Sequence, residues 1–178
     1  RQNEVAAIAQ EPMRGVIDAL ATIEMDEVVR CVCTLPEGNF AAGFDSGTLH
    51  IYGSDGVVIR TATLDSRVVG LASLRDVLVA VTSTGGVQAF RDEPLWDRPL
   101  KSGCEVVTAS SLHAVVADGT GQLISLADDG SEVAQAEFGH VSSLTCSPDG
   151  VCAAALEDGR LLLLGPAFEV LHDSPAAE

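Results

Sequence analysis

The sequence has very little positive charge. Only 10 of its 178 residues are lysine or arginine, against 26 aspartates and glutamates, and its single lysine is Lys101. Proteins bind nucleic acids and anionic membranes by neutralising phosphate groups with lysine and arginine. We therefore expect neither a nucleic acid nor a membrane as a partner. Two explanations of the net charge of −16 stay open: a solvated, soluble surface, or an acidic face for a basic protein partner.

Long apolar runs are also lacking. The sequence contains no stretch of 18 uncharged apolar residues and no signal-peptide pattern, so we expect no membrane span. Apolar residues make up 47% of the chain and charged residues 20%, a balance typical of globular rather than disordered proteins. The length is sufficient for one domain with a sizeable core.

The usual motifs of catalysis and metal binding are missing. The acidic, glycine-rich segments 118–122 (DGTGQ) and 127–132 (ADDGSE) lack the ligand series of an EF-hand, and neither stands between a strand and a helix as a phosphate loop does. No G-x-S-x-G motif occurs. The histidines are not paired at ligand or triad spacing; they are His50, His113, His140 and His172. The sequence therefore predicts no catalytic residue, no metal site and no cofactor.

The five cysteines do not follow the spacing of a zinc site. Cys31 and Cys33 are one residue apart and so share a face of a strand, and no second cysteine or histidine pair completes a ligand set; the others are Cys104, Cys146 and Cys152. Free cysteine is among the most buried residue types. We therefore expect all five to be buried thiols of the core, which favours a reducing compartment and a cytoplasmic location.

Glycines recur at a nearly constant interval. Gly47, Gly85, Gly121 and Gly159 are separated by 38, 36 and 38 residues and stand in the segments FDSGTLHIY, TSTGGVQAF, DGTGQLISL and LEDGRLLLL. A short strand of small apolar residues precedes each one: FAAGF, VLVAV, HAVVA and CAAAL. Still further upstream come VVRCVCTL, VVGLASL, CEVVTAS and VSSLTCS. A period near 40 residues with about four strands per repeat is typical of propeller blades.

The repeat is clearest in residues 141–164, VSSLTCSPDGVCAAALEDGRLLLL. Three short apolar runs are separated by SPDG and EDG turns, in which Pro148 fixes φ and Gly150 and Gly159 supply positive φ. Such runs bounded by tight turns predict strands, here an antiparallel meander.

The chain resembles the WD-repeat and related quinoprotein-like β-propellers. Its fourth repeat has Gly139-His140 before the first strand, SPDG after it and Asp158-Gly159 in the next turn. It departs from the WD pattern at Leu164-Gly165, where the terminal Trp-Asp would stand, while Trp96-Asp97 falls on a fourth strand, out of register. The hydrogen-bonded His/Ser/Asp/Trp arrangement of that family is therefore not carried over. The resemblance covers most of the chain as architecture and one repeat as motif.

This pattern predicts an all-β fold, a β-propeller of four-stranded antiparallel blades in a single domain, 1–178. The blades are expected at 28–66, 67–103, 104–140 and 141–174, after a half blade at 1–27. A helix over residues 4–22 is the alternative for that first segment, although Pro12 and Gly15 would interrupt it. Because four and a half blades close a ring poorly, we expect a larger ring, completed by another segment or another copy of the chain.

Two classes of function remain. The resemblance implies a non-enzymatic scaffold that binds protein partners through a loop face of the propeller, made of the turns between second and third strands and the joins between blades. The candidate residues on that face are Asp45, Ser46, Arg67, Thr82, Thr84, Lys101, Asp118, Thr120, His140, Glu157 and Asp158. The alternative is an enzyme, or a propeller that binds a metal or small molecule, with its site in the central channel. The expected channel lining, VRCVCT, VGLASL, VVTASS and SSLTCS, is small and mostly neutral, so we expect no enzyme.

Overall fold

The computed structural model describes residues 23–175, and all structural statements below concern these residues. The predicted half blade and its helical alternative lie mainly in residues 1–22, outside the described part. In residues 23–175 the strands form four sheets, and each sheet holds four strands that are paired antiparallel in chain order. The predicted all-β architecture of four-stranded antiparallel blades is therefore confirmed.

Each blade is an antiparallel meander. Blade 1 consists of β1 (Val29–Thr34), β2 (Phe40–Phe44), β3 (Thr48–Tyr52) and β4 (Val58–Thr63), with a short 3-10 turn, η2 (Pro36–Gly38), after β1. Blade 2 consists of β5 (Val68–Leu74), β6 (Val77–Thr82), β7 (Gly86–Phe90) and β8 (Pro94–Pro99). Blade 3 consists of β9 (Cys104–Ala109), β10 (Ala114–Asp118), β11 (Gln122–Leu126) and β12 (Glu132–Glu137). Blade 4 consists of β13 (Val141–Cys146), β14 (Cys152–Leu156), β15 (Leu161–Leu164) and β16 (Val170–Ser174).

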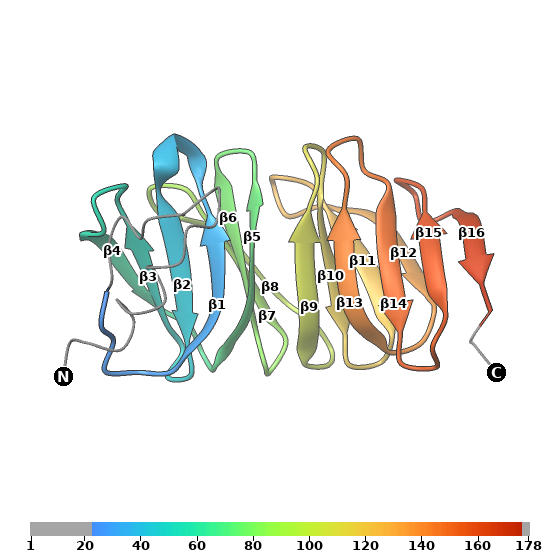
Figure 1. The fold of residues 1–178 in the computed structure, drawn as a ribbon, viewed down its shortest axis with the longest axis horizontal. Coiled ribbons are helices and arrows are strands. Elements are labelled where there is room, and N and C mark those ends of the chain that lie inside the picture. Colours follow the sequence, from blue (N-terminus) through green and yellow to red (C-terminus); the bar gives the residue numbers. More distant parts are fainter. Residues whose placement is uncertain (1–22, 176–178) are drawn as a thin grey trace, which may run out of the picture.

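The blades are arranged side by side in an open arc. The first strands of neighbouring blades contact one another, β1 with β5, β5 with β9 and β9 with β13, so these strands form the inner edge of the arc. Figure 1 shows blade 1 and blade 4 at opposite ends of the molecule. The described residues therefore form part of a ring and do not close it.

The marker glycines are required by the turns between second and third strands. Gly47, Gly85, Gly121 and Gly159 all have positive φ, between 86° and 98°, and each donates its backbone N–H to the carbonyl three residues earlier. A Cβ atom on Gly85 would lie 2.2 Å from the carbonyl oxygen of Ser102. Both the conformation and the lack of space thus restrict this position to glycine, which explains the period seen in the sequence.

Apolar side chains fill the junctions between blades. The residue two positions after each marker glycine, Leu49, Val87 or Leu123, is completely buried against the next blade. The equivalent residue of blade 4, Leu161, is 46% exposed, and Leu163, two residues further along β15, is 37% exposed. Blade 4 therefore presents the same apolar pattern as the other blades on a face that no described residue covers.

The opposite end of the arc differs, because residues 23–28 run beside blade 1. The carbonyl of Val28 accepts a hydrogen bond from the backbone N–H of Asp45, as the carbonyls of Arg67 and His140 do from the equivalent turns of blades 2 and 4. Met25 packs with the aromatic cluster of blade 1, and the Tyr52 hydroxyl donates to its sulfur at 3.2 Å. Residues 23–28 thus have the form of a join between blades.

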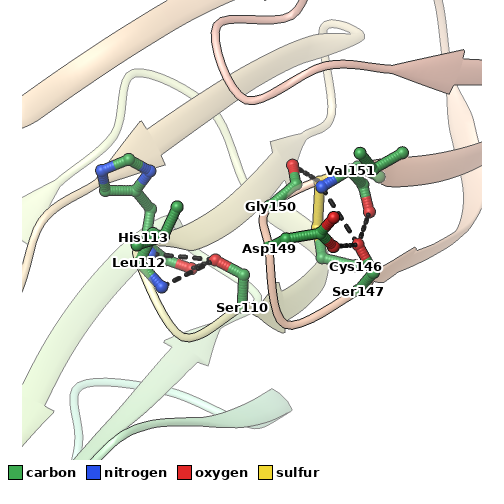
Figure 2. Close-up of a disulfide and its surroundings, with 9 residues drawn as sticks. Ser110, Leu112, His113, Cys146, Ser147, Asp149, Gly150 and Val151 are labelled. Carbon is green, nitrogen blue, oxygen red and sulfur yellow. Dashed lines mark hydrogen bonds between the residues drawn. A yellow bond between two sulfur atoms is a disulfide. The ribbon is translucent and has the colours of Figure 1, made fainter.

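The expectation of five buried thiols holds in full only for Cys104. Cys146 and Cys152 are directly opposite each other in the β13–β14 hairpin, with Cα atoms 4.1 Å apart, and they form a disulfide (Figure 2). Cys31, Cys33 and Cys104 are free, and only Cys104 is fully buried. The hairpin register explains the difference, because it brings the two sulfur atoms into bonding distance.

The disulfide closes a turn that contacts its neighbouring blade. The Pro148 carbonyl in this turn accepts a hydrogen bond from the backbone N–H of Ser111 in blade 3, and the Ser111 carbonyl accepts one from the Arg75 side chain of blade 2. Figure 2 shows the β9–β10 loop, where Ser110 accepts hydrogen bonds from two backbone N–H groups, beside the disulfide. Blades 2, 3 and 4 are therefore linked through their loops as well as through their cores.

Candidate interaction face

The predicted site residues lie at one end of the blades. In an antiparallel four-stranded blade, the β2–β3 type of turn and the join to the next blade are at the same end, the lower end in Figure 1. We call this end face A and the opposite end, with the loops after first and third strands, face B. The topology places all eleven predicted residues on face A, but their environments differ.

Two of the eleven are buried parts of the turns. Thr82 and Asp118 occupy the first position of equivalent turns and are 0% and 3% exposed. The Thr82 hydroxyl accepts a hydrogen bond from the backbone N–H of Gly86 at 2.9 Å, and the Asp118 carboxylate accepts one from that of Gln122 at 3.0 Å. Both side chains therefore satisfy their own turn and are not available to a partner.

The charge of Asp118 is stabilised in spite of burial. Burial raises the pKa of this carboxyl, but hydrogen bonds from the Thr120 hydroxyl, at 2.7 Å, and from the backbone N–H groups of Gln122 and Thr120 outweigh that effect. The pKa of Asp118 consequently lies below its ordinary value. A buried, hydrogen-bonded carboxylate of this kind holds the shape of the turn.

Asp45 instead belongs to an exposed ion network. The Arg30 side chain donates two hydrogen bonds to its carboxylate, at 2.8 and 3.1 Å, and an Arg67 nitrogen lies 3.8 Å from the same carboxylate. The hydrogen bond from Arg30 lowers the pKa of Asp45. The Ser46 hydroxyl, in the same turn, donates to the Glu27 carboxylate and lies 2.8 Å from the Thr48 hydroxyl. This network spans the join between two blades at the inner edge of face A, and its side chains are about half exposed to solvent.

A second polar network lies between blades 1 and 2. The Thr84 hydroxyl donates to the carboxylate of Asp65 at 3.0 Å and lies 2.8 Å from the Ser66 hydroxyl, which the Ser83 hydroxyl also approaches at 3.4 Å. Asp65 is exposed and was not among the predicted residues. Asp65 could have been predicted from its position in a join between blades, three residues before the fifth strand.

The remaining predicted residues lie on blades 3 and 4. His140 faces Glu105, with 3.6 Å between its Nδ1 and the carboxylate. Asp158 accepts hydrogen bonds from the backbone and side chain of Arg160, whose backbone hydrogen bond lowers the pKa of this aspartate. Glu157, beside it, is exposed. The partners Arg30 and Glu105 were not predicted, because their positions on first strands hide the fact that they meet the turn residues, and Arg160, just before β15, was not predicted either.

A groove between blades 2 and 3 brings three predicted residues together. Lys101, Asp118 and Thr120 line it, together with residues from β8, β11 and β12, and its volume is about 370 Å³. Its lining is mainly polar, and Arg98 and Glu132 form an ion pair there.

The inner edge of the arc carries no cluster suited to metal chemistry. Among residues 23–175 no group of three or more histidine, cysteine or acidic side chains is arranged to hold a metal ion. The first strands contribute small and apolar side chains except at face A, where Arg30 and Glu105 are charged. Within the same described range, no helix has the length and apolar character needed to cross a membrane.

No protein-family model matches the sequence, and no curated protein matches it either. Solved structures do match. A crystal structure of BBS1N in complex with ARL6DN superposes with a TM-score of 0.76 at 11% identity, over 89% of this chain and 58% of that one. BamB from Moraxella catarrhalis gives a TM-score of 0.74 at 16% identity, over 90% and 52% of the two chains. The fold is that of a β-propeller.

The β-propeller domain of Cps50 (Swd1) from Myceliophteria thermophila gives a TM-score of 0.75 at 15% identity, over 90% of this chain and 59% of that domain chain. The WD40 repeats of RRP9 (TM-score 0.74, 12% identity, 84% of this chain and 52% of that one) and the BamB propeller are thus both similar in structure to this chain, as the sequence resemblance implied. The chain spans between about half and three fifths of the length of these structures. At such low identity the similarity establishes the fold alone.

Proposed function

We propose that this chain is a non-enzymatic interaction scaffold that binds a protein partner on face A. The observation that carries the proposal is the set of exposed polar side chains that four blades present at this face. Arg30, Asp45 and Arg67 hold one another in fixed positions at the inner edge, so a partner meets an ordered surface. Preordered side chains reduce the entropy cost of binding.

The similar structures support a protein partner in general terms. One of them, BBS1N, was solved in complex with ARL6DN. Exposed acidic side chains on face A, among them Asp45, Asp65 and Glu157, favour a partner with a basic surface, because complementary charges speed association and select the partner. We propose no catalytic residue, no metal and no cofactor for this face.

The test compares two variants with the same change of charge. The first is Asp45→Asn/Asp65→Asn/Glu157→Gln, on face A; the control is Asp55→Asn/Asp128→Asn/Asp149→Asn, in face B loops, and all six side chains are exposed. A partner isolated from native extract by the unaltered chain is titrated against both. We expect the face A variant to bind about tenfold more weakly and the control to bind normally. Equal binding by both variants would contradict the proposal.

We further propose that a second copy of the chain completes the ring. Leu161 and Leu163 of blade 4 are exposed where equivalent residues of blades 1 to 3 are buried by the following blade. At the other end of the arc, a hollow of about 320 Å³ beside blade 1 is lined by apolar residues such as Ile23, Phe44 and Val58 and by the acidic side chains of residues 24, 26 and 27. Two such arcs supply eight blades, which lies within the range of known propellers.

The predicted cytoplasmic location stays a prediction. Five free thiols would favour a reducing compartment, whereas the Cys146–Cys152 disulfide favours an oxidising one, since disulfides persist mainly there. Counting the reactive thiols of the denatured protein, isolated from its native source, decides between an oxidising and a reducing compartment. Three free thiols per chain indicate an oxidising compartment, and five indicate a reducing one.

A further inference from the structure

A groove on face B separates blades 1 and 2. Its volume is about 550 Å³, within the range of known ligand sites. The apolar part of its lining comes from the β1–β2 loop, the outer strands of blade 1 and the core of blade 2, and it consists of Leu35, Pro36, Ile51, Ile59, Leu78 and Phe90. The groove thus has an apolar floor that belongs to two blades.

The equivalent space between blades 2 and 3 is occupied by the chain's own tryptophan. Trp96 lies against Gly130, where an added Cβ atom would stand 2.7 Å from the indole ring. Its Nε1 donates a hydrogen bond of 2.9 Å to the carbonyl of Asp128 in the next blade. The junction between two blades of this chain can therefore accept an indole ring with its N–H satisfied.

Arg60 occupies the corresponding position between blades 1 and 2. It pairs with Ile51 as Trp96 pairs with Ala89, and both Ile51 and Ala89 follow their marker glycine by four residues. The Arg60 side chain donates to the Arg91 carbonyl at 2.9 Å, and its guanidinium lies 5.7 Å from the centre of the Phe90 ring. The guanidinium covers the floor of the groove but does not fill the groove.

The rim of this groove carries acidic side chains that lack an internal partner. The Arg91 side chain forms an ion pair with Asp76, with 2.7 Å between nitrogen and oxygen. Glu37 and Asp92 also line the groove, and neither forms an ion pair with any residue between 23 and 175. A ligand that combines an apolar ring with a positive charge therefore complements both the floor and the rim.

We propose that the groove between blades 1 and 2 binds a peptide segment of a partner protein in which an aromatic residue is flanked by basic residues. The aromatic ring stacks on the Arg60 guanidinium, in a cation–π contact, and lies over the apolar floor, as Trp96 lies in the next junction. The flanking basic residues pair with Glu37 and Asp92. This inference rests on the proposed protein-binding function, but it assigns a second surface, on the opposite face from face A.

The test uses defined tripeptides and the full chain. Acetyl-Arg-Trp-Lys-amide is titrated into the protein while the methyl signals of Leu35, Ile59 and Leu78 are followed by NMR. Two comparison peptides separate the contributions: acetyl-Arg-Gly-Lys-amide lacks the ring, and acetyl-Glu-Trp-Glu-amide reverses the charge. We expect the first peptide to shift all three sets of signals and each comparison peptide to bind about tenfold more weakly, as for the loss of an anchor residue or its charge partners.

Two variants locate the binding. Arg60→Trp copies the residue that fills the next junction, so it is expected to fold and to abolish binding. Leu95→Trp adds the same ring at an exposed position of β8, outside the groove, and is expected to bind like the unaltered chain. Unchanged binding by Arg60→Trp, or equal binding of the three peptides, would overturn the proposal.

Other occupants of the groove give a different result. If residues 1–22 or a second copy of the chain fill it, the tripeptide shifts none of the three methyl signals in the full chain, and this too overturns the proposal. A negative result here does not contradict partner binding on face A, because the face A variants change none of the groove residues.

Discussion

Replacing Asp118 with alanine should destabilise the protein far more than the same change at Asp45. The Asp118 side chain is 3% exposed and accepts hydrogen bonds from the backbone N–H groups of Thr120 and Gln122 and from the Thr120 hydroxyl. Alanine leaves these donors without their acceptor. Each buried donor that loses its partner costs about 1–3 kcal/mol, and because water can reach exposed Thr120, we expect a total loss of about 3 kcal/mol.

The assay is urea unfolding followed by circular dichroism. At a typical slope of about 2 kcal/mol per molar urea, Asp118→Ala should lower the unfolding midpoint by about 1.5 M. Asp118→Asn keeps an acceptor oxygen and should lie between the alanine variant and the unaltered chain. Asp45→Ala removes an exposed ion pair and should hardly move the midpoint, since exposed pairs contribute little.

Asp118 should thus contribute strongly to stability and Asp45 hardly at all, although both stand in turns of the same face. If Asp118→Ala unfolds at the midpoint of the unaltered chain, the assignment of Asp118 to turn stability is refuted. If Asp45→Ala is the more damaging variant, the distinction drawn from burial is wrong.

Three further predictions concern acid, reduction and thiol reactivity. The pKa values of Asp118, Asp45 and Asp149 are lowered in the folded state. The stability that these carboxylates contribute is therefore present above the ordinary aspartate pKa of 3.8 and should be lost as the pH falls below it. A melting temperature that does not fall between pH 6 and pH 2 would contradict this. Cys146→Ala/Cys152→Ala should lower the free energy of unfolding by about 2 kcal/mol, because the six-residue separation closes only a small loop, and an unchanged urea midpoint would argue against the disulfide. Burial raises the pKa of Cys104 to about 12, so iodoacetamide at pH 8 should leave this residue unmodified in the folded chain, and rapid labelling detected by mass spectrometry would contradict its burial.

The repeat architecture could be predicted because the turns impose it on the sequence. At positions such as Gly85, a positive φ and a neighbouring carbonyl exclude residues other than glycine. Glycine therefore recurs once in each blade, and its spacing gives the length of the repeat. The small apolar residues before each marker glycine, and the buried apolar residue two positions after it in blades 1 to 3, reflect the junctions between blades. Trp96 was likewise placed on a fourth strand, where the structure has it.

The disulfide and the site were harder to predict. Cys146 and Cys152 flank a four-residue turn, but their bond depends on the hairpin register, which makes them direct opposites, and this register was not worked out from the sequence. Asp45 and Asp118 appear equivalent as turn aspartates, yet one stands at the second turn position and is exposed, while the other stands at the first and is buried. Arg30 meets Asp45 across 15 residues, a contact that spacing alone does not reveal.

The exposed leucines of blade 4 should control whether two copies of the chain associate. Leu161→Ser/Leu163→Ser changes only side chains that are exposed in the single arc, so at protein concentrations low enough to keep the unaltered chain monomeric we expect this variant to fold with little loss of stability. The matched control is Leu123→Ser, at the equivalent position in blade 3, which is completely buried and should lose several kcal/mol. A large loss of stability in the first variant would show that its leucines are already covered within one chain.

The most direct test of an open arc completed by a second copy is the light-scattering mass of the full chain and of Leu161→Ser/Leu163→Ser. We expect twice the 18.4 kDa of one chain for the unaltered protein and 18.4 kDa for the variant. A mass of 18.4 kDa for both proteins, each with a cooperative thermal melt, would contradict completion of the ring by a second copy.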